Sequence, residues 1–116
     1  MGNYTALARA SWYRDTHPRV PQRGQVGWVD ASGDFYAADT VSDIWYLAVA
    51  LCHRLGETNV AVDPIGAGTE AQDPCLWLED HGWVAFIPTA GYGRPVYGRP
   101  LSEGQKRAII RLGGVL

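Results

Sequence analysis

Residues 40–56 read TVSDIWYLAVALCHRLG, and this stretch decides the fold. Thr40 and Asp43 have the spacing of a capping box, with Asp in place of Glu or Gln. Gly56 stands where a residue in the left-handed conformation commonly ends a helix. Apolar side chains cover most faces of the turns between them, so the sequence predicts a buried central helix over 41–55. Its main inward stripe is expected to consist of Ile44, Leu47, Ala48, Leu51 and Leu55.

Two Gly-Trp-Val elements lie on either side of this helix. Residues 25–30 and 34–38 are strand candidates joined by a short Ser-Gly turn, a pattern that predicts a β-hairpin. Residues 83–88 are a third strand candidate. Because Trp28 and Trp83 then lie on strands that precede capped helices, both are predicted to be core residues.

Two further helices are predicted from their first residues. An Asp-Pro dipeptide begins a short helix over 74–81, with the carboxylate as cap and Pro at the first helical position. Ser102 and Gln105 have capping-box spacing and begin a helix over 103–112. Residues 57–72 show no periodicity and are expected to form a long loop.

These elements predict an α+β fold, in which a small antiparallel sheet of about three strands is packed by three or four short helices. A length of 116 residues is that of a single domain, expected to span 1–116. Residues 1–24 would form an N-terminal arm with a short helix at 4–14, and 25–113 would form the core. The side chains of that short helix expected to face inward are Leu7 and Trp12.

The chain contains an internal echo. Each Gly-Trp-Val element is followed by a connection, a capped helix and the tripeptide Arg-Leu-Gly. A degenerate two-fold repeat and a coincidence both stay open, because Arg-Leu-Gly is a common helix end. A true repeat predicts that the two Gly-Trp-Val strands lie side by side in one antiparallel sheet, with the helices on one face.

Charge is distributed unevenly, although the net charge is only −2. Residues 1–24 hold four arginines against one aspartate, and residues 90–116 hold five basic side chains against Glu103. Residues 25–89 hold ten acidic side chains against Arg54 alone. The basic ends either pack beside the acidic middle and cancel its field, or present a basic face to an acidic partner.

The strongest candidate surface follows the third strand. The tetrapeptide Tyr-Gly-Arg-Pro occurs at 92–95 and again at 97–100, just before the basic final helix. Tyr and Arg are enriched at hot spots of protein interfaces, so a protein partner is the first hypothesis. Nucleic-acid binding is the alternative, with Arg on phosphates and Tyr stacked on bases. The residues expected to contact the partner are Tyr92, Arg94, Tyr97, Arg99, Arg107 and Arg111.

Catalytic and metal sites have weaker support. Cys75 and His81 are the best nucleophile and base, and Glu79 and Asp80 beside His81 can serve acid–base chemistry, so a small hydrolase is a further alternative. Two turns of helix, however, separate Cys75 from His81 by roughly 8–10 Å. The zinc-ligand types Cys52, His53, Cys75 and His81 lack the spacing of a structural site. We expect no catalytic residue, no metal and no cofactor.

The composition favours a cytoplasmic protein that does not enter a membrane. Two cysteines in a chain with 47% apolar residues are expected to be free thiols. The first residues lack the basic and apolar regions of a secretory signal. The longest apolar stretch, 44–52, is too short to span a bilayer.

The sequence resembles small uncharacterised proteins of bacteriophages and mobile elements over residues 26–113. The matching motifs are Gly-Trp-Val-x-x-x-Gly-x-Phe-Tyr at 27–36, His-Gly-Trp-Val at 81–84 and Leu-Ser-x-x-Gln at 101–105. The resemblance implies a non-enzymatic protein that binds and inhibits or tethers a host macromolecule in the host cytosol. Inhibitors of host defence complexes, of the anti-CRISPR kind, are included in that group.

Overall fold

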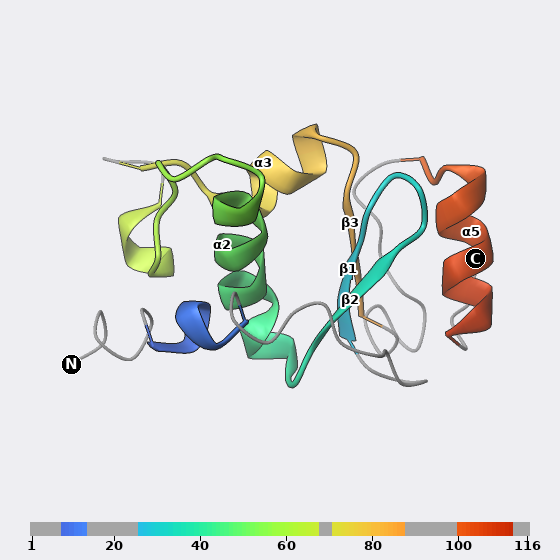
Figure 1. The fold of residues 1–116 in the computed structure, drawn as a ribbon, viewed down its shortest axis with the longest axis horizontal. Helices are drawn as coiled ribbons and strands as arrows, with labels where there is room; N and C mark the ends of the chain where they lie inside the picture. Colours follow the sequence, from blue (N-terminus) through green and yellow to red (C-terminus); the bar gives the residue numbers. More distant parts are fainter. Residues whose placement is uncertain (1–7, 14–25, 68–70, 88–99, 113–116) are drawn as a thin grey trace.

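The structure is a computed structural model that describes residues 8–13, 26–67, 71–87 and 100–112 (Figure 1). Within these ranges it contains one three-stranded antiparallel sheet and four α-helical segments, one of which is 8–13. The predicted α+β fold is therefore confirmed.

The sheet is built from the three predicted segments, each slightly shorter than expected. Its strands are β1 (Val26–Val29), β2 (Phe35–Ala38) and β3 (Val84–Phe86). Strand β1 lies in the centre and pairs antiparallel with both neighbours, so that Trp28 lies opposite Tyr36 on one side and Ala85 on the other. The two Gly-Trp-Val strands are thus neighbours, as the repeat hypothesis predicts.

The central helix α2 (Ile44–Arg54) begins with a single 3-10 turn, η1 (Val41–Asp43). Thr40 Oγ1 accepts a hydrogen bond from the backbone N–H of Asp43 at 3.3 Å, and Gly56 ends the helix with a φ of 94°. Leu55 was predicted to face inward, and this is wrong: its side chain is 51% exposed. Leu55 follows the last helical residue, where the chain already turns away from the core.

Helix α3 (Pro74–Asp80) confirms the predicted Asp-Pro start. Asp73 Oδ1 accepts hydrogen bonds from the backbone N–H groups of Cys75 at 2.8 Å and Leu76 at 3.1 Å. Gly82, with a φ of 94°, ends the turn that leads into β3. A cap and a glycine therefore fix both the direction of α3 and the start of the third strand.

The segment between α2 and α3 is more ordered than its composition suggests. It contains a 3-10 turn, η2 (Pro64–Gly66), and an isolated parallel bridge between Val60 and Gln72. Trp45 Nε1 donates a hydrogen bond to the Val62 carbonyl at 3.1 Å and ties the segment to α2. The segment is thus a loop among its described residues, as predicted, and the bonds that order it were not visible in the sequence because the bridge and the Trp45 bond are non-local.

Helices cover both faces of the sheet (Figure 1). On one face Trp28 and Ala38 pack with α2 and with Leu78 of α3. On the other, α5 (Glu103–Arg111) and the residue after it contribute Ala108, Ile109 and Leu112. The strand residues that face α5 are Val29, Phe35, Ala37, Val84 and Phe86.

The repeat hypothesis also predicts helices on one face, and this part of it is wrong. Successive strand residues point to opposite sides of a sheet, and here Trp28 and Val29 are both fully buried. Ala37 and Ala38 behave in the same way on β2. A strand that is apolar on both faces needs a cover on each, and α5 provides the second one.

Trp28 and Trp83 are core residues, as predicted. The exposed fraction is 0% for Trp28 and 8% for Trp83. Trp28 Nε1 donates a hydrogen bond to the Ile44 carbonyl at 3.0 Å, which joins the central strand to the first turn of α2. Trp83 packs on Tyr36, with ring centroids 5.3 Å apart. Both indoles are thus part of the architecture on the α2 side of the sheet.

Candidate partner-binding surface

The predicted capping box places α5. Ser102 Oγ accepts from the backbone N–H of Gln105 at 3.1 Å, and Gln105 Oε1 accepts from the backbone N–H of Ser102 at 2.9 Å. Ser102 Oγ also donates to the Ala31 carbonyl at 2.8 Å, in the turn between β1 and β2. The same hydroxyl therefore begins the helix and attaches it to the hairpin.

Gln105 has a second role that the sequence did not reveal. Its side chain is 1% exposed, and its Nε2 donates to the carbonyls of Asp30 at 3.2 Å and Gly82 at 2.7 Å. These carbonyls belong to the two segments that flank the sheet at this end. Because a buried amide without partners is costly, these bonds hold α5 in one position against both segments.

The hairpin turn and α5 approach each other closely at two glycines. A Cβ added to Gly104 would lie 2.4 Å from the Ser32 carbonyl oxygen, and one added to Gly33 would lie 2.5 Å from the Gly104 carbonyl oxygen. Gly33 also has a φ of 102°. Asp30 Oδ1 stabilises this turn by accepting the backbone N–H groups of Ser32, Gly33 and Asp34. The backbone of the hairpin turn is therefore in direct contact with the backbone of α5, which fixes the distance between them.

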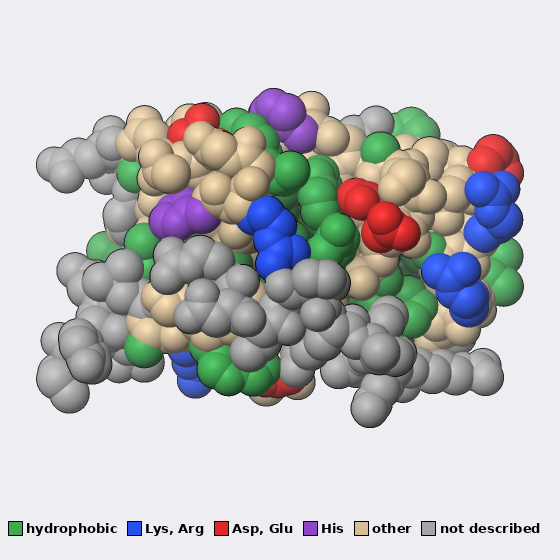
Figure 2. Space-filling view, in the orientation of Figure 1, with side chains coloured by type: hydrophobic (Ala, Val, Ile, Leu, Met, Phe, Trp, Pro, Cys, Tyr) green, Lys and Arg blue, Asp and Glu red, His purple; other side chains and the backbone are tan. Residues whose placement is uncertain are grey.

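The outer face of α5 is basic. Arg107 and Arg111 are exposed, and basic side chains gather over α5 at the end of the molecule away from α2 (Figure 2). Lys106 Nζ forms an exposed ion pair with Glu103 at 3.3 Å. Within the described ranges, no carboxylate forms an ion pair with Arg107 or Arg111. Two of the six predicted contact residues therefore share one exposed helix face.

The other four predicted contact residues lie outside the described residues. These are Tyr92, Arg94, Tyr97 and Arg99. The chain becomes described again at residue 100, three residues before α5 begins. The two Tyr-Gly-Arg-Pro tetrapeptides thus precede the first residue of α5 closely along the chain.

The catalytic candidates on α3 are arranged differently from a nucleophile and its base. Burial raises the pKa of the Cys75 thiol to about 12, and the nearby Asp73 carboxylate adds to this effect. His81 Nδ1 lies 2.6 Å from the Trp77 carbonyl, and its ring stacks on Trp77 at 3.8 Å. Burial also raises the pKa of Glu79. A thiol that holds its proton so firmly is a poor nucleophile near neutral pH.

The two cysteines are free, and Cys52 Sγ lies 3.6 Å from the Pro74 carbonyl. Burial raises the pKa of the Cys52 thiol to about 12 as well. Among the described residues, no group of three or more His, Cys, Asp or Glu side chains is arranged to hold a metal ion.

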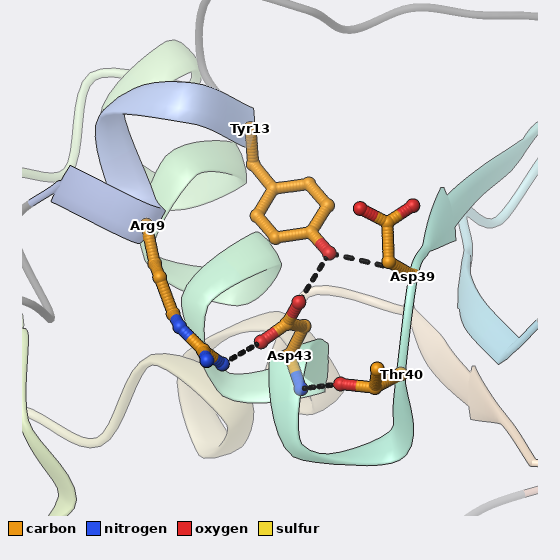
Figure 3. A network of polar contacts seen from close by, with 5 residues as sticks. All are labelled: Arg9, Tyr13, Asp39, Thr40 and Asp43. Atoms are coloured by element: carbon orange, nitrogen blue, oxygen red, sulfur yellow. Dashed lines mark hydrogen bonds and ion pairs between the residues drawn. The ribbon is translucent and has the colours of Figure 1, made fainter.

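A buried polar cluster around Asp43 was missed by the sequence analysis (Figure 3). Its carboxylate pairs with Arg9 and accepts a hydrogen bond from the Tyr13 hydroxyl at 2.7 Å. The Tyr13 hydroxyl in turn accepts from the backbone N–H of Asp39 at 2.8 Å. Burial raises the pKa of Tyr13 above its ordinary value. The cluster fastens helical residues 8–13 to the start of α2.

This cluster corrects the expectation for the N-terminal helix. Trp12 was predicted to face inward, but it is 43% exposed, whereas Tyr13 is 1% exposed. Leu7, the other expected inward residue, lies outside the described residues. The four-residue spacing of Arg9 and Tyr13 places both on one helix face and was the signal for this contact.

The polar clusters described above hold the fold together, whereas the outer face of α5 carries charges that the described part of the chain leaves unpaired.

In the described ranges, no helix has the length and apolar character needed to cross a membrane. No family model matches the chain, and neither does any curated protein or solved structure.

Proposed function

We propose that this chain is a small non-enzymatic binding protein that inhibits or tethers another macromolecule through the outer face of α5 and the adjoining residues 92–99. The observation that carries the proposal is the contrast on α5 itself. Its inner side is held by Gln105 and two glycine contacts, while Arg107 and Arg111 project outward without a described carboxylate. A rigid helix with unpaired cations is pre-organised for an acidic partner.

The state of the thiols disfavours a hydrolase that uses Cys75 as its nucleophile. Both cysteines have pKa values raised to about 12, so little thiolate forms near neutral pH. Replacing Cys75 with Ala is therefore expected to leave the biological effect unchanged. The version of the hydrolase alternative that uses Cys75 as nucleophile requires loss of the effect in that variant.

Nucleic-acid binding remains the second candidate, because unpaired arginines also suit phosphates. The net charge of −2 opposes it, since non-specific binding to nucleic acid depends on an excess of positive charge. A labelled DNA duplex titrated at low salt separates the two candidates. A shift that weakens steeply with salt would support nucleic acid, and no shift at low salt would eliminate it.

The proposal is tested by capture from a bacterial lysate, with the chain immobilised and bound proteins identified by mass spectrometry. The resemblance to phage proteins makes a bacterial defence complex the first partner to look for. The double variant Arg107→Glu/Arg111→Glu is expected to lose the captured protein, since charge reversal at a rim acts on both association rate and affinity. Arg94→Glu/Arg99→Glu is expected to weaken capture in the same way.

A control is Arg54→Glu, which reverses one charge at an exposed position at the end of α2 and is matched to the single variants Arg107→Glu and Arg111→Glu. It is expected to retain capture, because the effect depends on the place of the charge. Unfolding midpoints of Arg54→Glu and of Arg107→Glu/Arg111→Glu should stay close to that of the unaltered chain, since these three side chains are exposed. Retained capture by Arg107→Glu/Arg111→Glu would refute the surface.

A further inference from the structure

The basic face of α5 also carries an apolar side chain. Ile110 is 60% exposed, although the opposite side of the same helix buries Ala108 and Ile109. Arg107 precedes Ile110 by three residues and Arg111 follows it directly, so all three share the outer half of the helix. An exposed isoleucine side chain lowers the free energy of a complex when a partner covers it and removes it from water.

The arginine and isoleucine side chains on this face favour different contacts, the first with carboxylates and the second with apolar groups. Arg107 and Arg111 form no ion pair with any carboxylate in the described ranges, whereas Lys106 is already paired with Glu103. Guanidinium groups bind carboxylates through two parallel hydrogen bonds. A group of arginines around an apolar contact is the composition found at the centre of protein interfaces.

We propose that Arg107, Ile110 and Arg111 together bind an acidic amphipathic segment of a protein, with one carboxylate on each guanidinium and an apolar side chain against Ile110. This inference rests on the proposed function and names the chemistry of the partner. Side chains four residues apart on a helix are about 5–6 Å apart at Cβ. The matching carboxylates are therefore one helical turn apart in the partner, or two residues apart on a strand.

Ile110 is also the feature that favours an acidic protein over a nucleic acid. A phosphate backbone satisfies Arg107 and Arg111 equally well, but the phosphates and sugars beside it give the exposed Ile110 side chain a less apolar contact than an aliphatic side chain does. An acidic amphipathic segment satisfies all three residues at once. Dependence of binding on Ile110 is thus the property that separates the two kinds of partner.

The test uses the full chain and a fluorescent helical peptide that carries Glu at two positions four residues apart, with Leu three residues after the first. Binding is followed by anisotropy, next to a labelled DNA duplex. We expect the peptide to bind, Arg107→Gln/Arg111→Gln to weaken it about tenfold or more, and Ile110→Ala to weaken it about threefold to tenfold. Replacing the peptide's Leu with Ala should match the effect of Ile110→Ala.

Three outcomes would overturn the inference: no binding of the peptide, peptide binding that is equal in Arg107→Gln/Arg111→Gln, or tighter binding of the duplex with no effect of Ile110→Ala. All variants alter exposed residues, so an unchanged unfolding midpoint shows that each is folded. Failure here is distinguishable from failure of the proposed function. Lysate capture that depends on Arg107 and Arg111 while the peptide does not bind keeps the function and removes only the acidic amphipathic partner.

Discussion

The two faces of the sheet are covered in different ways. On the α2 face, large side chains such as Trp28, Leu47 and Leu51 are almost completely buried in one apolar cluster. On the α5 face the apolar cluster has fewer members, and the helix is positioned as much by Gln105 and by the contact of Gly33 with Gly104. Burial holds one helix, whereas polar bonds and backbone contact help to hold the other.

This difference leaves different amounts of the two helices exposed. Helix α2 is buried along most of its length, so little of it can meet a partner. Helix α5 buries only Gln105, Ala108 and Ile109, which leaves its charged half exposed. The larger apolar cluster and the proposed binding surface thus lie on opposite sides of the same small sheet.

The largest effect is expected from a substitution in the apolar cluster on the α2 face. Replacing Trp28 with Ala removes a fully buried indole and its hydrogen bond to the Ile44 carbonyl, and should lower the free energy of unfolding by about 3–5 kcal/mol. Urea denaturation measures this loss. Trp28→Phe keeps most of the volume and should cost clearly less. Equal stability of Trp28→Ala and the unaltered chain would refute the role of this side chain.

A smaller effect is expected from a substitution that disrupts the contact between the hairpin turn and α5. Gly33→Ala combines a positive φ with a Cβ only 2.5 Å from the Gly104 carbonyl oxygen, and should cost about 3 kcal/mol of unfolding free energy. Gly56→Ala is the matched control, because Gly56 has a similar φ of 94° and no atom within 4 Å of the added Cβ. It should cost only about 1 kcal/mol. Equal losses in urea denaturation would mean that the turn does not hold α5.

The third effect is on pH dependence and belongs to the α2 face. Burial raises the pKa of Cys52 and Cys75 to about 12, above the value of about 8.5 expected in the unfolded chain. Below that lower value both states keep the thiol protons, and the stabilising contribution is complete. It is lost as pH rises from about 9 to about 12, because the unfolded chain releases these protons first.

Urea midpoints measured at about pH 7, 9 and 10 should therefore fall toward alkaline pH. The fall should be shallower in Cys52→Ala/Cys75→Ala. It should not vanish, since burial also raises the pKa values of Tyr36 and Tyr13. A fall of the same steepness in the double variant would contradict the assignment to the thiols.

Local signals in the sequence predicted the elements well. Asp73, Ser102 and Gly56 act through neighbouring residues, so the helix ends that they mark could be recognised before the fold was known. The number of layers could not be recognised as easily. That number depends on whether the sheet is covered both on the face of Trp28 and on the face of Val29. The two Gly-Trp-Val elements stand out in the sequence mainly by their tryptophans, and the apolar residues on the other face stand out less.

The candidate surface was predicted only in part, for a similar physical reason. Arg107 and Arg111 stand out by charge, and both are exposed on α5. Ile110 does not stand out, because one apolar residue in a helix is expected to face inward, and only packing shows that Ala108 and Ile109 take that side. The long-range bonds of Gln105 and Asp43 also join segments far apart in sequence, which no spacing rule connects.

The most direct test of this division between the two faces is amide hydrogen exchange of the full chain, alone and bound to the captured partner. The account predicts that added protection on binding is concentrated in α5 and residues 88–100, with α2 and α3 unchanged. Protection concentrated in α2, α3 or the acidic residues 57–73, with α5 unchanged, would contradict it.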